Sequence, residues 1–166
     1  MSAPAPFAPI PAGRLFLQPI TASVAAAILE GDLTGIPAGE GWPHDDTLDG
    51  LRLAVGAGFA PGWFVTLDGQ VIGDCGTHGP ADAEGEIEIG YGLAPLFRGR
   101  GHGTELVRAL SGWLLAQPGI LRVRARINAQ NVPSRRALER AGFTLAGREA
   151  DVLRYALAKL GPEAHT

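Results

Sequence analysis

The chain of 166 residues is predicted to be an α/β protein of the α+β type, in which helices pack on one mixed sheet. Segments that alternate apolar and polar residues, as strands do, recur through the first hundred residues. A strand–helix–strand–helix–strand–strand order follows them. The composition is 46% hydrophobic and 19% charged, which argues against a disordered chain, and the length suits one domain with a sizeable core.

The N-terminal residues hold four prolines within residues 1–13, and we expect them to form a flexible arm. A single domain is then expected over residues 14–160, with residues 161–166 as a tail. Arg14–Pro19 alternates and predicts the first strand. Thr21–Glu30 begins with a good capping residue and is followed by a glycine, so it predicts a short helix.

The middle of the chain begins with a loop rich in glycine and proline over Leu33–Pro43, and loops of this kind are often functional. Thr47–Val55 predicts a second helix, because two glycines follow it closely. Trp63–Leu67 and Val71–Thr77 flank an Asp-Gly pair, which is a strong hairpin signal. Glu86–Leu93 alternates and predicts the next strand.

The last third alternates helices and strands. Thr104–Gln117 carries an apolar stripe at helical spacing, and Arg122–Ile127 alternates as a strand. Ser134–Ala141 predicts a short helix that ends at a glycine. Phe143–Glu149 and Val152–Ala158 predict a closing pair of strands.

Charge is divided unevenly along the chain. Residues 1–97 carry twelve Asp or Glu and two Arg, whereas residues 98–166 carry twelve Lys or Arg and five Asp or Glu. The basic part suits an anionic ligand and the acidic part a cationic substrate, although both could be solvated faces. The low pI disfavours a nucleic-acid partner.

Targeting and metal signals are weak. No apolar run is long enough for a membrane span, and the N-terminus does not resemble a secretory signal, so a cytoplasmic protein is expected. Cys75 is the only cysteine, which rules out an internal disulfide and a cysteine cluster. Four scattered histidines give little support to a metal site, and none is expected.

The densest signal is a glycine loop between a strand and a helix, Arg98-Gly-Arg-Gly-His-Gly103. Free backbone N–H groups and a helix N-terminus make such a loop an anion site, suited to a pyrophosphate. Arg98 and Arg100 add full charges that pair with phosphate oxygens. A tight turn that needs glycine is the alternative. The loop lacks the Lys of a phosphate-binding P-loop, and the spacing of its glycines does not fit the dinucleotide fingerprint.

Three ordered blocks carry a family resemblance: Glu88–Leu93 (EIGYGL), the loop Arg98–Gly103, and Asn128–Phe143 with its N-x-x-N-x-x-S start. Together they resemble the GNAT family of N-acetyltransferases, closest in motif to the branch of ribosomal-protein N-terminal acetyltransferases. The resemblance implies a mixed, mostly antiparallel sheet that splays between its fourth and fifth strands. Those strands are here Glu86–Leu93 and Arg122–Ile127.

The resemblance also implies a function. It indicates transfer of an acetyl group from acetyl-CoA, as co-substrate, to a primary amine by direct attack. The acceptor is then a small molecule or a protein N-terminus, and a homodimer is possible. A non-catalytic acyl-CoA-binding module with the same fold is the alternative, and no membrane partner is expected.

The residues that this resemblance places at acetyl-CoA surround the splay and the loop. Asn131 and Ser134 also fit a turn residue and a helix cap, and His102 also fits a filler of the loop. The expected set is Tyr91, Gly92, Leu93, Arg98, Gly99, Arg100, Gly101, His102, Gly103, Thr104, Asn131, Ser134 and Arg135.

Catalytic roles follow from the needs of amine acetylation. The amine must lose a proton, and Glu88 matches the glutamate that serves the family as a base. Glu86 is the other glutamate available for this role, because alternation places it on the same face of the strand as Glu88. The alternative is that both are surface glutamates of an exposed strand. For the thioester oxygen, the resemblance implies a backbone N–H donor of the fourth strand, near Tyr91 or Gly92. The helix after the N-x-x-S block lacks the tyrosine that many relatives use as an acid, so Ser134 is the candidate proton donor to the thiol.

Overall fold

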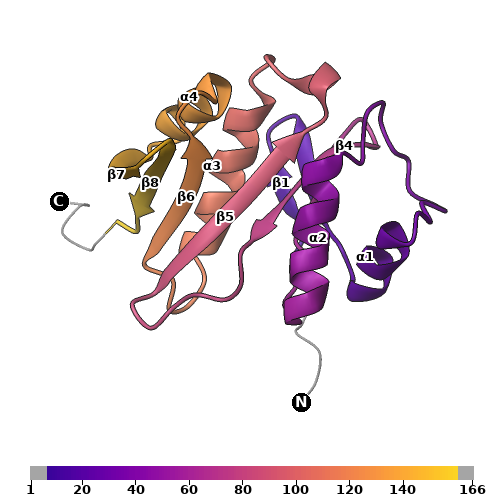
Figure 1. Ribbon diagram of the computed structural model, residues 1–166, viewed down its shortest axis with the longest axis horizontal. Helices are drawn as coiled ribbons and strands as arrows, with labels where there is room; N and C mark the ends of the chain where they lie inside the picture. The colour runs from indigo at the N-terminus through magenta and orange to yellow at the C-terminus, as the bar shows by residue number, and fades with distance from the viewer. Residues whose placement is uncertain (1–6, 161–166) are drawn as a thin grey trace.

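The computed structural model describes residues 7–160 as one eight-stranded sheet with helices on both faces (Figure 1). Its elements are β1 (Ile10–Ala12), β2 (Leu15–Pro19), α1 (Ala22–Leu29), α2 (Asp45–Ala57), β3 (Trp63–Leu67), β4 (Gln70–Thr77), β5 (Glu86–Leu93), the 3₁₀ turn η1 (Pro95–Phe97), α3 (His102–Leu115), β6 (Arg122–Asn128), α4 (Val132–Arg140), β7 (Thr144–Glu149) and β8 (Val152–Ala158). The strand order is β1-β2-β3-β4-β5-β6-β8-β7. All neighbours pair antiparallel except β5 and β6, so the predicted mixed, mostly antiparallel sheet is confirmed.

The N-terminal segment corrects the prediction of a flexible arm over residues 1–13. Ile10–Ala12 pairs with β2 as an edge strand, and Ile10 and Ala12 are buried. Phe7 stacks on Trp63 with 4.2 Å between ring centroids and meets Trp113 edge to face. The four prolines led to the prediction of an arm without a strand. The strand can form because proline is tolerated at a sheet edge. Residues 1–6 of the arm and the tail 161–166 lie outside the described residues.

The sheet has a separate hydrophobic core on each face. α3 and α4 cover one face, where Leu106 and Leu110 of α3 are fully buried against the strands. α1 and α2 cover the opposite face over the first half of the sheet, where Ile28 and Leu51 pack with Phe64. In Figure 1 β5 crosses in front of α3, while α2 lies on the near side. Within residues 7–160, no helix lies on the part of the near face formed by β6, β7 and β8 (Figure 1).

The pairing between β5 and β6 stops halfway along both strands. Four residue pairs are in register, from Glu86↔Arg122 to Ile89↔Ala125. Beyond them β5 continues along β4, and β6 continues along β8. The predicted splay between these two strands is therefore confirmed. It leaves one edge of β5 without a strand partner after Ile89.

Among the described residues, no helix combines the length and the apolar character that a membrane crossing requires.

Candidate active site

The unpaired edge of β5 offers backbone groups to a ligand. Ala94 N–H donates to Ile72 C=O and His78 N–H donates to Glu88 C=O, so the even-numbered residues of β5 bond to β4. Because hydrogen-bonding direction alternates along a strand, the N–H of Tyr91 points away from β4 and into the gap. The N–H of Gly92 points to β4 instead. The predicted oxyanion donor near Tyr91 or Gly92 is therefore better placed at Tyr91.

The glycine loop ends at the N-terminus of α3. Gly99 and Gly101 have φ of 76° and 83°, a left-handed conformation that favours glycine. Gly101 is the N-cap of α3 and provides no side chain to cap it, so the first N–H groups of this helix lack that partner. The helix dipole adds positive character at the same point. This geometry suits a phosphate group and supports the binding role predicted for the loop.

Arg14 anchors the loop from the turn between β1 and β2. Its Nη2 donates to the C=O of Arg100 at 2.9 Å, and its guanidinium pairs with Glu105 at 2.7 Å. Glu105 in turn lies in the first turn of α3. The sequence analysis did not single out Arg14, because its role depends on the fold bringing residues about 90 positions apart together.

The side chains of the loop differ in their hydrogen bonds and burial. Arg98 Nε donates to the C=O of Leu93 at 2.9 Å, so part of its guanidinium holds the loop against β5. His102 is 3% exposed, and its Nδ1 has no hydrogen-bond partner among the described residues. Burial lowers the pKa of His102, which keeps the ring neutral near pH 7. Thr104 lies next to it, in the first turn of α3.

The start of α4 faces the same gap. Asn131 is the N-cap of α4, and its side-chain oxygen accepts from the N–H of Ser134 at 3.3 Å. The alternative reading of Ser134 as a cap is therefore wrong, and Ser134 lies inside the first turn. The hydroxyl of Tyr91 donates to the C=O of Ser134 at 3.4 Å. Arg135 Nη1 donates to the C=O of Ala129 at 3.4 Å and braces the preceding turn.

Burial raises the pKa of Tyr91 above its ordinary value, so its hydroxyl keeps its proton at neutral pH. Tyr155, the other tyrosine, is 1% exposed and donates to Glu139 at 3.1 Å. Tyr155 therefore packs in the core, and Tyr91 is the tyrosine near the gap.

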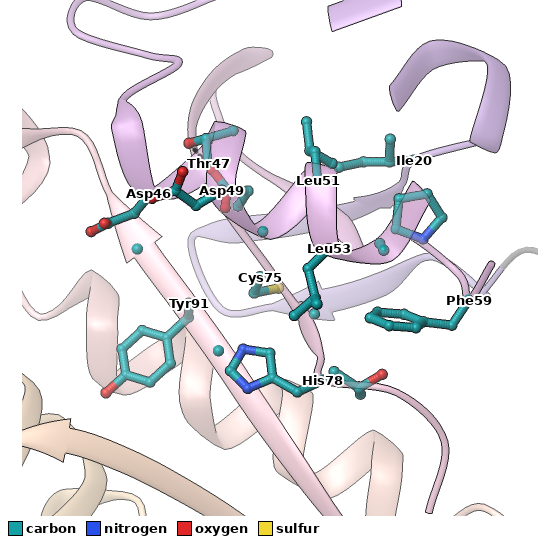
Figure 2. Close-up of a pocket in the computed structure, with 18 of the residues that line it drawn as sticks. Ile20, Asp46, Thr47, Asp49, Leu51, Leu53, Phe59, Cys75, His78 and Tyr91 are labelled. Atoms are coloured by element: carbon teal, nitrogen blue, oxygen red, sulfur yellow. Dashed lines mark hydrogen bonds between the residues drawn. The ribbon is translucent and has the colours of Figure 1, made fainter. Parts of the chain in front are cut away.

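A cavity of about 490 Å³ lies on the other face of the sheet, between α2 and the strands β4 and β5 (Figure 2). Its strand side is formed by residues without side chains, because Gly76 pairs directly with Gly90 and Gly92 comes next on the same face. Tyr91 also lines the cavity, so the cavity reaches the gap between β5 and β6. Two ligands could therefore meet there from opposite faces.

Glu88 lies beside this cavity, as alternation predicted, but its carboxylate is already engaged. Arg126 Nε contacts one oxygen at 2.9 Å, and His78 Nδ1 contacts the other at 2.7 Å. Only 13% of the Glu88 side chain is exposed. Burial raises the pKa of Glu88, but the hydrogen bonds and charge of His78 and Arg126 outweigh burial and lower the pKa.

Two histidines, His44 and His78, lie over the glycines of β5. A Cβ on Gly90 would be 2.5 Å from His78 Nε2, and a Cβ on Gly92 would be 3.2 Å from His44 Cε1. His44 caps α2, because its Nδ1 accepts from the N–H of Thr47. Alternation could have shown that His78 follows Gly76 on the glycine face of β4, but nothing in the sequence places His44 there.

Asp74 joins the cavity to the N-terminal end of α2. Its carboxylate accepts from Trp42 Nε1 at 2.9 Å and from the hydroxyl of Thr47 at 2.5 Å. Burial raises the pKa of Asp74 despite these hydrogen bonds. Asp46 and Asp49 of α2 also line the cavity, which gives this wall an acidic character.

Within residues 7–160, no group of three or more His, Cys, Asp or Glu side chains is placed to hold a metal ion.

The chain was compared with known families, proteins and structures. A family model described as "Acetyltransferase (GNAT) domain" matches residues 14–144. The chain belongs to this family. The family prediction is therefore confirmed, and the match runs from β2 to β7 and includes the loop, the gap and the cavity.

Two bacterial relatives share part of the sequence. N-acetyltransferase YjdG of Bacillus subtilis (strain 168) is 32% identical over 82 residues, which are 49% of each protein. N-acetyltransferase p20 of Bacillus licheniformis is 31% identical over 78 residues, which are 47% of this chain and 44% of that protein. The match thus spans about half the length of either relative.

Solved structures share the fold. RimJ of Mycobacterium smegmatis, solved with CoA-disulfide, has a TM-score of 0.65 and 23% identity, covering 93% of this chain and 88% of that one. RimL, described as a ribosomal L7/L12 alpha-N-protein acetyltransferase and solved with coenzyme A, has a TM-score of 0.66 and 21% identity. That match covers 91% of this chain and 98% of RimL. At such identities the likeness shows the fold alone, and the predicted branch within the GNAT family stays a prediction.

Proposed function

We propose that this protein is an acetyltransferase that moves an acetyl group from acetyl-CoA to a primary amine by direct attack. One observation carries the proposal. The edge of β5 that parts from β6 lies between the glycine loop Arg98–Gly103 and a cavity on the opposite face of the sheet. A long anionic thioester can therefore reach Tyr91 from the side of the loop, and an amine can reach it from the cavity on the opposite face.

The residues around the gap fit acetyl-CoA. The loop Arg98–Gly103 and the N-terminus of α3 would hold its pyrophosphate through backbone N–H groups, helped by Arg100. The free edge of β5 would bond its pantetheine amides. Acetyl-CoA supplies an acetyl thioester, whose carbonyl oxygen gains negative charge as the amine attacks. The N–H of Tyr91 is placed to stabilise that charge.

The cavity side fits a cationic acceptor. The carboxylates of Asp46, Asp49 and Asp74 line it, and they would attract an ammonium group. The acceptor class remains as broad as the sequence predicted, a small-molecule amine or a protein N-terminus. RimL, which shares the fold, is described as an α-N-protein acetyltransferase, which favours testing peptides early.

The thiolate that leaves needs a hydrogen-bond donor on the α4 side of the gap. Ser134, the predicted donor, lies in the first turn of α4. The hydroxyl of Tyr91 reaches the same turn and stays protonated, so it provides a second donor close by. We retain Ser134 in this role and place Tyr91 next to it. The cytoplasmic location and the homodimer remain predictions.

Calorimetric titration tests the proposal first. Acetyl-CoA is expected to bind saturably with a Kd of about 1 μM, near −8 kcal/mol, whereas ATP and NADPH are not. Thiol release is then measured with three amines: a short peptide with a free N-terminus, spermidine and kanamycin. Acetyl-CoA binding without thiol release for any amine would favour a non-catalytic acyl-CoA-binding module. A preference for ATP or NADPH would refute the assignment of the loop.

A further inference from the structure

We propose that His78 is the catalytic base that takes the proton from the acceptor amine, and that Glu88 is a positioning residue that acts through it. The inference rests on the proposed function, because it names the proton acceptor of that reaction. It replaces the expectation that Glu88 is itself the base. The inference rests on the contacts of His78, on the space over Gly90, and on the position of His78 and Gly90 in the wall of the cavity.

The hydrogen bonds of His78 fix which ring nitrogen carries the proton. Glu88 is ionised and offers only lone pairs, and its Oε2 lies 2.7 Å from His78 Nδ1. The proton therefore lies on Nδ1, and Nε2 keeps its lone pair. Arg126 holds the same carboxylate at 2.9 Å and 3.1 Å, which locks its orientation. A carboxylate that orients a histidine in this way is a recurring arrangement in general-base catalysis.

The free nitrogen lies on the cavity face of β5, one residue before Tyr91. Nε2 of His78 lies over Gly90, at 2.5 Å from the position that a Cβ would occupy. Gly90 therefore provides the room in which this ring sits. The next residue is Tyr91, whose N–H points into the gap. In Figure 2 the His78 ring lies over the β5 ribbon, and the Tyr91 side chain projects from the ribbon close by.

Glu88 is poorly placed to accept the proton itself. Both of its oxygens already have partners, and only 13% of the side chain is exposed. His78 is 44% exposed and lines the cavity. Charged groups from four elements surround its ring. Glu88 of β5 contacts it directly, and Asp74 of β4, Arg126 of β6, and Asp46 and Asp49 of α2 line the same cavity.

The proton and electron balance is simple. One proton of the ammonium acceptor passes to Nε2 of His78, and the freed nitrogen lone pair forms a bond to the thioester carbonyl carbon. The carbon–sulfur bond then breaks, and its electron pair leaves on sulfur. The second proton of the nitrogen goes to the thiolate, and His78 releases its own proton to solvent. The products are an acetamide, CoA thiol and one proton.

Kinetics with an amine that the thiol-release screen identifies provide the main test. We expect His78→Gln to lower kcat by about 10²-fold or more, while the Kd for acetyl-CoA stays within twofold. A fall in kcat/KM of the wild type toward acidic pH should be absent in His78→Gln. Because His78 is partly exposed, free imidazole should restore part of the activity of His78→Ala.

Glu86→Gln is the matched control for Glu88→Gln. Glu86 lies two residues earlier on the same face of β5 and faces Arg124 at 3.5 Å. We expect Glu88→Gln to lower kcat by about tenfold or more and Glu86→Gln to leave it within twofold. Imidazole should rescue neither variant. The proposal is wrong if His78→Gln keeps its activity within threefold. It is also wrong, and Glu88 is the base, if kcat/KM still falls at acidic pH in His78→Gln but not in Glu88→Gln.

A measurement without any acceptor separates this proposal from the proposed function. Long-range ¹H–¹⁵N spectra report the tautomer of each histidine ring, assigned here by comparison with His78→Gln. The wild type should show His78 with its proton on Nδ1, and Glu88→Gln should increase the other tautomer. A proton on Nε2 in the wild type would overturn the assignment of the base. Absence of thiol release by the wild type with the peptide, spermidine and kanamycin would instead count against the proposed function.

Discussion

A methyl group added at Gly90 tests the arrangement of the cavity most directly. The Cβ of Gly90→Ala would lie 2.5 Å from His78 Nε2, about 1 Å closer than an ordinary contact. The His78 ring can move, because its side chain is 44% exposed, whereas the β5 backbone is held by β4. We therefore expect the ring to be pushed away by about 1 Å, which takes the 2.7 Å contact with Glu88 beyond hydrogen-bonding distance.

The expected cost falls on catalysis rather than on stability. A reacting group displaced by about 1 Å can cost about 10²-fold in rate, or about 2.7 kcal/mol of transition-state stabilisation. The lost hydrogen bond between His78 and Glu88 is partly exposed, so the free energy of unfolding should change by no more than about 1 kcal/mol. The gap and the loop are untouched, and the affinity for acetyl-CoA should stay within twofold.

The assay combines steady-state kcat and KM with urea denaturation and calorimetry of acetyl-CoA binding. Gly112→Ala in α3 is the control, because a Cβ there meets nothing within 4 Å. That variant should keep its activity and gain about 0.5–1 kcal/mol in the free energy of unfolding. The double variant Gly90→Ala/His78→Gln should be no slower than His78→Gln alone, because both changes act on one group.

Two results would refute this reasoning. Full activity in Gly90→Ala would mean that His78 does not need the space over Gly90. Losses that multiply in the double variant would mean that the methyl group acts elsewhere, for example on the acceptor itself.

Two further predictions concern the walls of the site. Burial places the pKa of folded Asp74 above its unfolded value, so the native state binds more protons between the two values and stability falls as pH rises through that window. Asp74→Asn should flatten this pH dependence when unfolding by urea is measured between pH 4 and pH 7. Asp74→Ala leaves Trp42 and Thr47 without an acceptor and should lower the free energy of unfolding by about 2–4 kcal/mol. Equal stability of the two variants would contradict this expectation. Arg14→Ala removes the bond to the loop and the pair with Glu105, so the Kd for acetyl-CoA should rise about fivefold at nearly constant kcat, and calorimetry showing an unchanged Kd would contradict the anchoring role.

The sequence predicted most of the elements because their signals are local. Alternation marked β5 with its exact bounds and β6 to within one residue, and the helical stripe marked α3 with each end two residues late. The short edge strand β1 was missed, because its stability comes from pairing with β2 and from Phe7 stacking on Trp63. The start of α4 was placed at Ser134 instead of Val132, because the capping role of Asn131 was not recognised.

Residues of the candidate site could likewise be predicted where the signal is local in the sequence. The loop and Tyr91 could be found from the sequence because a contiguous motif encodes them, and the structure places them at the gap and at α3. His44 and Arg14 could not, since each acts on a segment of chain that is distant in sequence. Glu88 was found by the same pattern, yet its role changed once its partners were known.

The change in the role of Glu88 shows what a motif leaves open. The residues EIGY fix where a carboxylate lies on β5, but the carboxylate's function depends on what β4 and β6 bring to it. Here β6 brings Arg126 and the end of β4 brings His78, and together they occupy both oxygens of Glu88. A related chain without a histidine at this place would leave the carboxylate free to accept a proton through water. The identity of the base should therefore follow the residue that faces Gly90, and placing the His78→Gln and Glu88→Gln pH profiles side by side would show whether it does.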